Sequence, residues 1–449
     1  MSWHIVCLAG STDRYTPALV PGDALLRVPF DTPGDVDGPQ ERLAESFAAA
    51  GVVLSPAAAD LLRAAIGAYA ADVRVPRQSA HDAWTHDLVL HLPITVAGWQ
   101  AGGPVLERLL RFLTGDHWRV MARDTPSGYQ PGWGRADGGI RPGRTADVAL
   151  FSGGLDSFIG AVDALGRAEA PMFVGHHAAG QGATSVSQRD ALAHLRDRYG
   201  ADQIRFLSCW VSIPKGRARA TEATTRGRSL LFLALGTALG TGLGANRLLV
   251  PENGLISLNV PLTPTRGGSL STRTTHPHLI ALYRQLLAAL GLALTVELPY
   301  RFATKGEILR ACADQELLAA ALADTMSCAH PSAGRFARSG AGRRHCGYCF
   351  PCLIRRAAIA SWRPDPTQYA YPRLDDTLTL GRRADLRAVR LALARYMRRP
   401  ATLSELLTAG PLPGSAEEHR AYLGAFRRGM GELAAFARGA IPGHDDASH

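Results

Sequence analysis

The amino-acid sequence predicts an α/β protein. Its central part is expected to be a parallel, doubly wound sheet, with a small α/β domain before it and a helical tail after it. Three observations lead to this prediction. From residue 148 on, short apolar runs of strand length alternate with longer helical runs. A stretch rich in Gly and Pro separates this part from the first 122 residues, and the end of the chain has helical periodicity without strand-like runs.

Residues 1–122 alternate strand-like and helical runs, which predicts the small α/β domain. The strand-like runs are Ile5–Leu8, Ala24–Val28 and Leu88–Leu92, and the helical runs are Glu41–Ala50, Ala57–Ala70 and Val105–Leu113. Trp99 and Trp118 are expected in its core. No constellation of catalytic residue types is recognisable here, so the role of this domain stays open.

Residues 123–146 are the predicted linker, because their density of Gly and Pro fits neither the helical nor the strand period. Residues 147–363 then form the predicted central domain, and residues 364–449 the helical C-terminal region. The helical runs of that last region are Asp385–Tyr396, Thr402–Leu407 and Glu417–Ala437.

The central domain begins with a regular alternation of elements. The predicted strands are Val148–Phe151, Met172–Gly175, Ile204–Ser208, Arg247–Val250 and Leu294–Leu298, and the predicted helices are Leu155–Leu165, Ser185–Tyr199, Ser229–Leu243 and His278–Leu290. This alternation indicates parallel strands with right-handed crossovers and helices on both faces of the sheet. A ligand is expected at the carboxyl ends of the strands.

The apolar run Leu230–Ala245 is shorter than the roughly 20 residues that cross a membrane. Its glycines at 236, 240 and 244 share one helical face, so we expect a buried helix that lies close against the sheet. No membrane partner is expected. The chain begins without a basic leader, and four of its seven cysteines crowd into one segment, which favours a cytoplasmic, reducing location.

The formal net charge of +10 is weak evidence for a nucleic-acid partner, because proteins that bind nucleotide phosphates also gather arginines. The basic residues do not interleave with aromatic ones as they often do on nucleic-acid surfaces. Only Lys215 and Lys305 are lysines, so we treat both as candidates for a specific role.

A Gly-rich hexapeptide lies between the first predicted strand and the first predicted helix of the central domain. Its residues, all candidates for binding phosphate groups, are Ser152, Gly153, Gly154, Leu155, Asp156 and Ser157. Two glycines let successive N–H groups turn toward phosphate oxygens, and the following helix directs its positive end to the same place. Asp156 is expected to cap this helix or to help organise a Mg²⁺ ion.

The cysteine-rich segment supplies four soft ligands, Cys328, Cys346, Cys349 and Cys352. Four thiolates at this spacing favour a closed tetrahedral Zn²⁺ site. An iron–sulfur cluster and reactive thiols remain alternatives. His330 and His345 are candidate substitute ligands.

The hexapeptide resembles the signature of the PP-loop ATP pyrophosphatases, a family with a HUP-like sheet. This resemblance implies that ATP is cleaved between its α- and β-phosphates, which yields an adenylated substrate and pyrophosphate. With Lys305, the four cysteines and Arg355, the chain is similar over residues 147–362 to the QueC family. That family makes 7-cyano-7-deazaguanine from 7-carboxy-7-deazaguanine, ammonia and ATP.

The resemblance to QueC implies roles for several further residues. Lys305 is expected to stabilise charge that accumulates on the α-phosphate, with a solvated lysine at a helix start as the alternative. Arg228 matches the arginine of the family's Arg-Asn pair, whereas Ser229 replaces the asparagine. The candidate catalytic residues are Lys305, Asp156 and Arg228, and the candidate substrate-binding residues are Arg226, Glu252, Asn253 and His176.

Two features distinguish the chain from the biosynthetic QueC enzymes. The polar run Ser269–His276 does not reproduce the family's short Asp-containing substrate loop, and the flanking N- and C-terminal regions are additional. In this respect the chain resembles the QueC-like proteins of bacterial antiphage systems, the QatC group above all and then those of type IV CBASS. That resemblance implies a deazapurine carboxylate as substrate and an amine on a partner protein of a defence operon as acceptor.

The sequence therefore predicts an AMP-forming, ATP-dependent C–N ligase that uses ATP, Mg²⁺ and Zn²⁺. The acceptor, a protein amine or ammonia, and the product, an amide or a nitrile, stay open. A tRNA-modifying PP-loop enzyme and a nucleotide-sensing subunit of a defence complex that does not turn ATP over are the alternative hypotheses.

Overall fold

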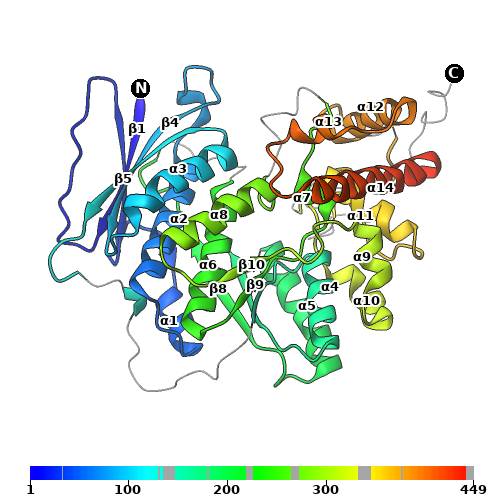
Figure 1. Cartoon of the computed structure of the whole chain (residues 1–449), viewed down its shortest axis with the longest axis horizontal. Helices are drawn as coiled ribbons and strands as arrows, with labels where there is room; N and C mark the ends of the chain where they lie inside the picture. The colour runs from blue at the N-terminus through cyan, green and yellow to red at the C-terminus, as the bar shows by residue number, and fades with distance from the viewer. Residues whose placement is uncertain are drawn as a thin grey trace.

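Two largely parallel β-sheets organise the chain, and the C-terminal helices lie on the far side of the second sheet (Figure 1). The computed structural model describes residues 1–32, 34–129, 132–134, 147–178, 182–218, 226–263, 273–331, 345–375 and 378–440. Most of the predicted linker and residues 269–272 of the polar run Ser269–His276 lie outside these ranges.

The first sheet has four parallel strands in the order β2-β1-β4-β5. These strands are β1 Ser2–Ala9, β2 Ala24–Phe30, β4 Asp87–Ile94 and β5 His117–Asp124, and the helices of this region are α1 Leu43–Ala49, α2 Pro56–Arg74 and α3 Trp99–Thr114. Trp99 and Trp118 are 1% and 0% exposed, which confirms their predicted place in the core.

The second sheet has six strands in the order β10-β9-β6-β7-β8-β3. Its strands are β3 Gln40–Glu41, β6 Asp147–Leu150, β7 Met172–His177, β8 Phe206–Ser212, β9 Arg247–Leu249 and β10 Thr295–Glu297. All neighbouring strands are parallel except β3, which pairs antiparallel with β8. The predicted parallel pairing of the central domain is confirmed, and the edge strand β3 comes from the N-terminal region.

Helices cover both faces of the second sheet. The helices of this part are α4 Leu155–Gly166, α5 Ala183–Tyr199, α6 Gly227–Leu243, α7 Gly254–Leu258 and α8 Pro277–Ala289. Phe151 packs into one apolar cluster with residues of α4 and α5, whereas Leu150 joins a different cluster with α6. At Gly236 an added Cβ would lie 2.7 Å from Leu248 and 2.8 Å from Leu150. The predicted close approach of this helix to the sheet is thus confirmed.

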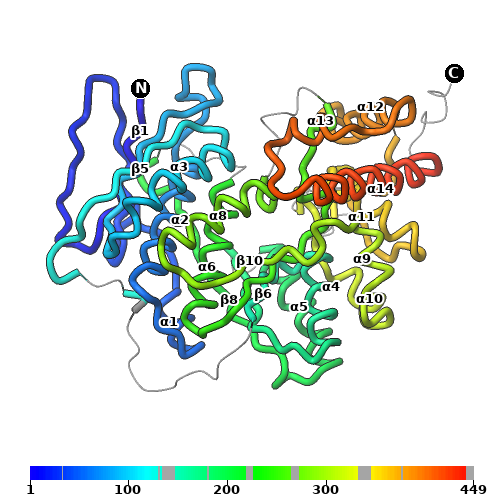
Figure 2. Tube along the Cα trace, viewed as in Figure 1, coloured from blue at the N-terminus to red at the C-terminus, as the bar shows by residue number. Residues whose placement is uncertain are grey.

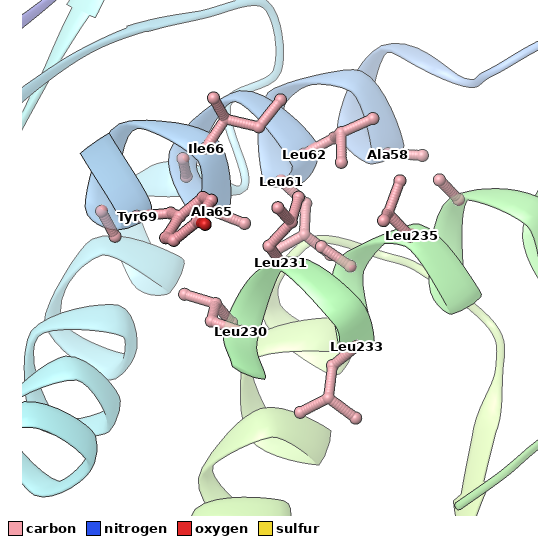
Figure 3. Packing of buried hydrophobic residues seen from close by; sticks show 14 of the residues in the cluster. Ala58, Leu61, Leu62, Ala65, Ile66, Tyr69, Leu230, Leu231, Leu233 and Leu235 are labelled. Carbon is pink, nitrogen blue, oxygen red and sulfur yellow. The ribbon is translucent and has the colours of Figure 1, made fainter. Parts of the chain in front are cut away.

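The two sheets share one hydrophobic core. Figure 3 shows α2 packed along α6, with Leu61, Leu62 and Ala65 facing Leu231 and Leu235. These side chains belong to a single buried cluster that continues from the first sheet into the second. The boundary expected near residue 123 therefore does not separate two hydrophobic cores.

The C-terminal helices form a second layer of packing, on the flank of the molecule opposite the first sheet (Figure 2). The remaining helices are α9 Lys305–Ala311, α10 Gln315–Ala321, α11 Phe350–Ala360, α12 Ala384–Arg398, α13 Leu403–Leu407 and α14 Ala416–Ala440. Residues of α11, α12 and α14 share one apolar cluster with three of the cysteines. Within the described ranges, no helix is long and apolar enough to cross a membrane.

Candidate functional site

A cavity of about 340 Å³ opens at the carboxyl ends of β6 and β9. From β6 the chain adds β7 and then β8 on one side of β6, and it returns to add β9 on the other side. The order of the strands therefore reverses between β6 and β9. Parallel sheets of this kind usually bind their ligands at such a reversal. The volume of the cavity is typical of small-ligand pockets. The cavity is lined by Leu150, Ser152, Ser157, His176, Thr184, Arg228, Ser229, Phe232, Leu233, Val250, Pro251, Glu252, Thr274, Thr275, Met326, Cys328 and Pro331.

The Gly-rich loop lies between β6 and α4, as the sequence predicts. Gly153 has a φ of +78°, and a Cβ there would lie 2.7 Å from the backbone nitrogen of Gln188. The hydroxyl of Ser152 accepts a hydrogen bond from the Gly154 N–H at 3.2 Å, and the Ser157 hydroxyl donates to the Gly154 carbonyl at 2.9 Å. Leu155 is fully buried and anchors the start of α4 in the core.

A buried ion pair joins this loop to α9. Asp156 and Lys305 form a short ion pair, and their side chains are only 6% and 4% exposed. Lys305 is the first residue of α9, whose start is fixed by a capping box of Thr304 and Glu307. The alternative of a solvated lysine at a helix start is therefore wrong.

Asn253 completes the polar cluster behind the cavity. It is 0% exposed, and its Nδ2 donates to Asp156 at 2.6 Å and to Glu252 at 3.2 Å. Its Oδ1 accepts the Ile256 N–H at 3.1 Å, which caps α7. Because these bonds occupy both ends of its buried amide, the structure does not support the predicted role of Asn253 in binding substrate, whereas Glu252 does line the cavity.

The surroundings shift the pKa values of the two carboxyl groups of this cluster in opposite directions. Burial raises the pKa of Glu252 well above its usual value, and the neighbouring charge of Asp156 raises it further. Burial acts on Asp156 in the same direction, but the charge of Lys305 and hydrogen bonds from Glu252, Lys305 and Asn253 outweigh it and lower the pKa of Asp156. The surroundings thus favour the ionised form of Asp156 and the protonated form of Glu252.

Arg228 reaches the cavity wall from the first turn of α6. Its Nε donates to Nδ1 of His176 at 3.1 Å, and Nε2 of His176 lies 3.1 Å from the carbonyl oxygen of Val211. Burial, together with the charge of Arg228, lowers the pKa of His176 to about 3. His176 is therefore neutral and orients Arg228, while His177 contacts Ser208 instead.

Arg226 lies away from the cavity wall. It is 4% exposed, its guanidinium donates to the carbonyl of Thr114, and its Cζ lies 5.4 Å from the centre of the Trp84 ring. These contacts of Arg226 join the start of α6 to the N-terminal region. They do not support the predicted role of Arg226 in binding substrate.

The four predicted metal ligands converge. The Sγ atoms of Cys328, Cys346, Cys349 and Cys352 all lie within 4.8 Å of one another. Two of the Sγ–Sγ distances, Cys328 to Cys349 and Cys346 to Cys352, are 3.9 Å. A tetrahedron with Zn–S bonds of about 2.3 Å has edges of about 3.8 Å, so the spacing fits one Zn²⁺ ion.

Backbone geometry supports this cluster. The N–H groups of His330 and Cys346 donate to Sγ of Cys328, both at 3.2 Å, and the Cys349 N–H donates to Sγ of Cys346 at 3.3 Å. Nε2 of His345 lies 3.2 Å from the Ser327 nitrogen, which donates to it. Cys328 also lines the cavity, so the four-cysteine cluster adjoins the candidate site.

Several residues that line the cavity were not predicted as site residues from the sequence. Thr274 and Thr275 line the cavity although they were noted only within a polar run, and Phe232, Met326 and Pro331 carried no recognisable signal. These residues belong to segments that are far apart in the sequence and come together only when the chain folds. No protein-family model matches this chain, and no curated protein matches it either.

Proposed function

We propose that the chain is an AMP-forming, ATP-dependent ligase of the QueC-like type that adenylates a 7-deazaguanine carboxylate and transfers it to an amine. The observation that carries this proposal is the position of the Ser152–Ser157 loop at the strand-order reversal, open to a cavity that Arg228 also lines. A PP-loop fold, a QatC-like place in antiphage defence and a cytoplasmic location belong to the same proposal.

The loop is suited to hold the phosphates of ATP. Ser152 and Ser157 bring hydroxyl groups to the cavity wall, and Gly153 lets the backbone turn where a side chain would collide with Gln188. The positive end of α4 adds a favourable field for an anion. These residues bind and orient the nucleotide.

Arg228 is placed to contact the reacting groups. His176 occupies its Nε, so the two terminal nitrogens of the guanidinium can contact a carboxylate or the α-phosphate from the cavity wall. Stabilising the charge that accumulates on the α-phosphate is the step in which a fixed cation lowers the barrier. Lys305 contributes through Asp156, whose charge it balances behind the loop.

Mg²⁺ would be held by carboxylate oxygens at this site, the ligands that it prefers. Lys305 and Asn253 already contact the carboxylate of Asp156, so Glu252, which lines the cavity, is our first candidate for a ligand. Glu252 would give up its proton when the ion binds. The ion would shield phosphate charge when bound.

In the four-thiolate cluster we propose Zn²⁺ in a structural role, since an iron–sulfur cluster contains several iron atoms and needs more widely spaced thiolates.

The test is product analysis with the purified chain. With ATP, Mg²⁺ and 7-carboxy-7-deazaguanine we expect pyrophosphate and the acyl adenylate, from which an added amine or water releases AMP in an amount equal to the pyrophosphate. Arg228→Gln should lower the rate of pyrophosphate release about 100-fold. Ser404→Ala, an exposed serine of α13, is the control that should not change it. ATP binding without pyrophosphate would instead support the nucleotide-sensing alternative.

The acceptor is tested by intact-mass analysis of proteins co-expressed from the same operon. A partner that gains the mass of the deazaguanine acyl group would identify a protein amine as the acceptor. If ammonia alone gives product, the chain acts as a small-molecule ligase.

A further inference from the structure

The start of α6, which carries Arg228, is held by the N-terminal region. One carboxylate oxygen of Asp72, near the end of α2, accepts the N–H groups of both Arg226 and Gly227, the latter at 2.9 Å. These are N–H groups at a helix start, which have no partner within their own helix. Asp72 therefore caps α6 from a helix more than 150 residues earlier in the chain.

The backbones of the two helices come unusually close at this point. A Cβ at Gly227 would lie 2.9 Å from Cα of Tyr69 and 3.1 Å from the carbonyl oxygen of Ala68. Only glycine permits this approach, because the colliding atoms belong to the backbone of α2 and cannot rotate away. The packing that continues from here along α2 and α6 is visible in Figure 3.

The same turn of α2 also supports the histidine that orients Arg228. The ring of Tyr69 meets the ring of His176 edge to face, with centroids 6.4 Å apart and planes at 88°. His176 in turn accepts the hydrogen bond from Nε of Arg228. Two residues of α2 thus support Arg228. Asp72 holds the start of the helix that carries it, and Tyr69 contacts its hydrogen-bond partner His176.

We infer that Asp72 and Tyr69 of α2 are positioning residues of the candidate active site, and that the N-terminal region serves to fix Arg228 against the anion bound in the cavity. The inference rests on the proposed function for the identity of that anion, and it names a role for residues outside the QueC-like part of the chain. A displacement of about 1 Å in such a group can cost about 100-fold in rate.

The test compares Asp72→Ala with Asp72→Asn and with Asp60→Ala. Asp60 is the matched control, because it is a buried carboxylate of the same helix whose bonds go to Arg63 and Thr95. We expect Asp72→Ala to weaken binding of ATP and of inorganic pyrophosphate, measured by calorimetry, about 10-fold, and to lower kcat further. Asp72→Asn keeps an acceptor oxygen and should recover most of the binding, and Asp60→Ala should leave binding unchanged.

The sign of the effect separates positioning from simple electrostatics. Removing a negative charge near an anion site would by itself strengthen anion binding, whereas loss of positioning weakens it. Gly227→Ala, which alters no charge, should weaken binding in the same way. Unchanged or tighter pyrophosphate binding in both Asp72→Ala and Gly227→Ala, in folded protein, would overturn the inference. Because pyrophosphate binding needs no turnover, this result is independent of whether the ligase reaction is found.

Discussion

At the scale of single residues, the pair of Asp156 and Lys305 is the most sensitive point of the site. Both side chains are almost fully buried, so removal of one leaves an uncompensated charge in the interior. We expect Lys305→Met to lower the free energy of unfolding by about 3–5 kcal/mol, measured by urea denaturation. The double variant Lys305→Met, Asp156→Asn has no such charge and should regain much of this stability. Additive losses in the double variant would contradict a direct pairing.

Gly153 should be required for both its backbone angle and its lack of a side chain. An alanine at a φ of +78° costs roughly 1–2 kcal/mol, and its Cβ would also collide with the backbone of Gln188. Gly115 is the matched control, because its φ is +79° and nothing lies within 4 Å of an added Cβ. We expect both alanine variants to lower the melting temperature, but only Gly153→Ala to abolish ATP binding measured by calorimetry.

Local sequence predicted the loop but not the partners of its residues. The strand, the Gly-rich turn and the helix of Ser152–Ser157 are encoded within a few consecutive residues, so the pattern is readable. Asn253 is different, because its amide is engaged by Asp156, 97 residues earlier in the chain. Arg226 likewise contacts Thr114, 112 residues away. A role in substrate binding was plausible for each until the fold showed which groups surround it.

At the scale of elements, the four cysteines that the sequence predicted to lie together do converge in the structure. Three of these cysteines are fully buried in the cluster that joins α11, α12 and α14, so the metal should stabilise this whole layer. We expect Cys349→Ser to lose more than about half of the bound zinc, measured by elemental analysis, and to lower the melting temperature. Cys312→Ser removes a buried thiol outside the cluster and should keep the zinc.

Strands proved harder to predict where they depend on distant pairing. The strand β3 has two residues and exists only through its antiparallel bonds to β8, so it has no periodicity to detect. The strand β5 is an edge strand in which most side chains are partly or fully exposed, and it lacks the apolar run of a buried parallel strand. Helices with long apolar faces, such as α2 and α6, were predicted within a few residues of their ends.

At the scale of the whole molecule, the cavity is supported from both flanks. The N-terminal region fixes α6, as argued above, and the C-terminal helix α14 fixes α9. Glu432 of α14 accepts hydrogen bonds from the Thr304 hydroxyl at 2.5 Å and from the Gly306 N–H at 3.3 Å. These two residues flank Lys305 in the chain. The N- and C-terminal regions therefore contact the elements that carry Arg228 and Lys305.

The shared core leads to a prediction about the chain without its first 124 residues. Removing them would expose leucines of α6, such as Leu231 and Leu235, that are buried against α2. Exposure of each buried leucine costs roughly 1.5–3 kcal/mol. The loss from a few leucines therefore equals the free energy of unfolding of a typical domain, which is roughly 5–15 kcal/mol. We expect residues 125–449 to unfold without a cooperative transition, measured by circular dichroism on heating.

A matched deletion makes this prediction specific. Removing residues 441–449 leaves every described contact in place and should preserve the cooperative transition. Co-expression of residues 1–124 with residues 125–449 should restore it, because α2 can then pack on α6 from a separate chain. If residues 125–449 alone melt cooperatively and bind ATP as tightly as the full chain, the N-terminal region is an independent module. In that case its contacts with α6 are not needed to hold Arg228 in place.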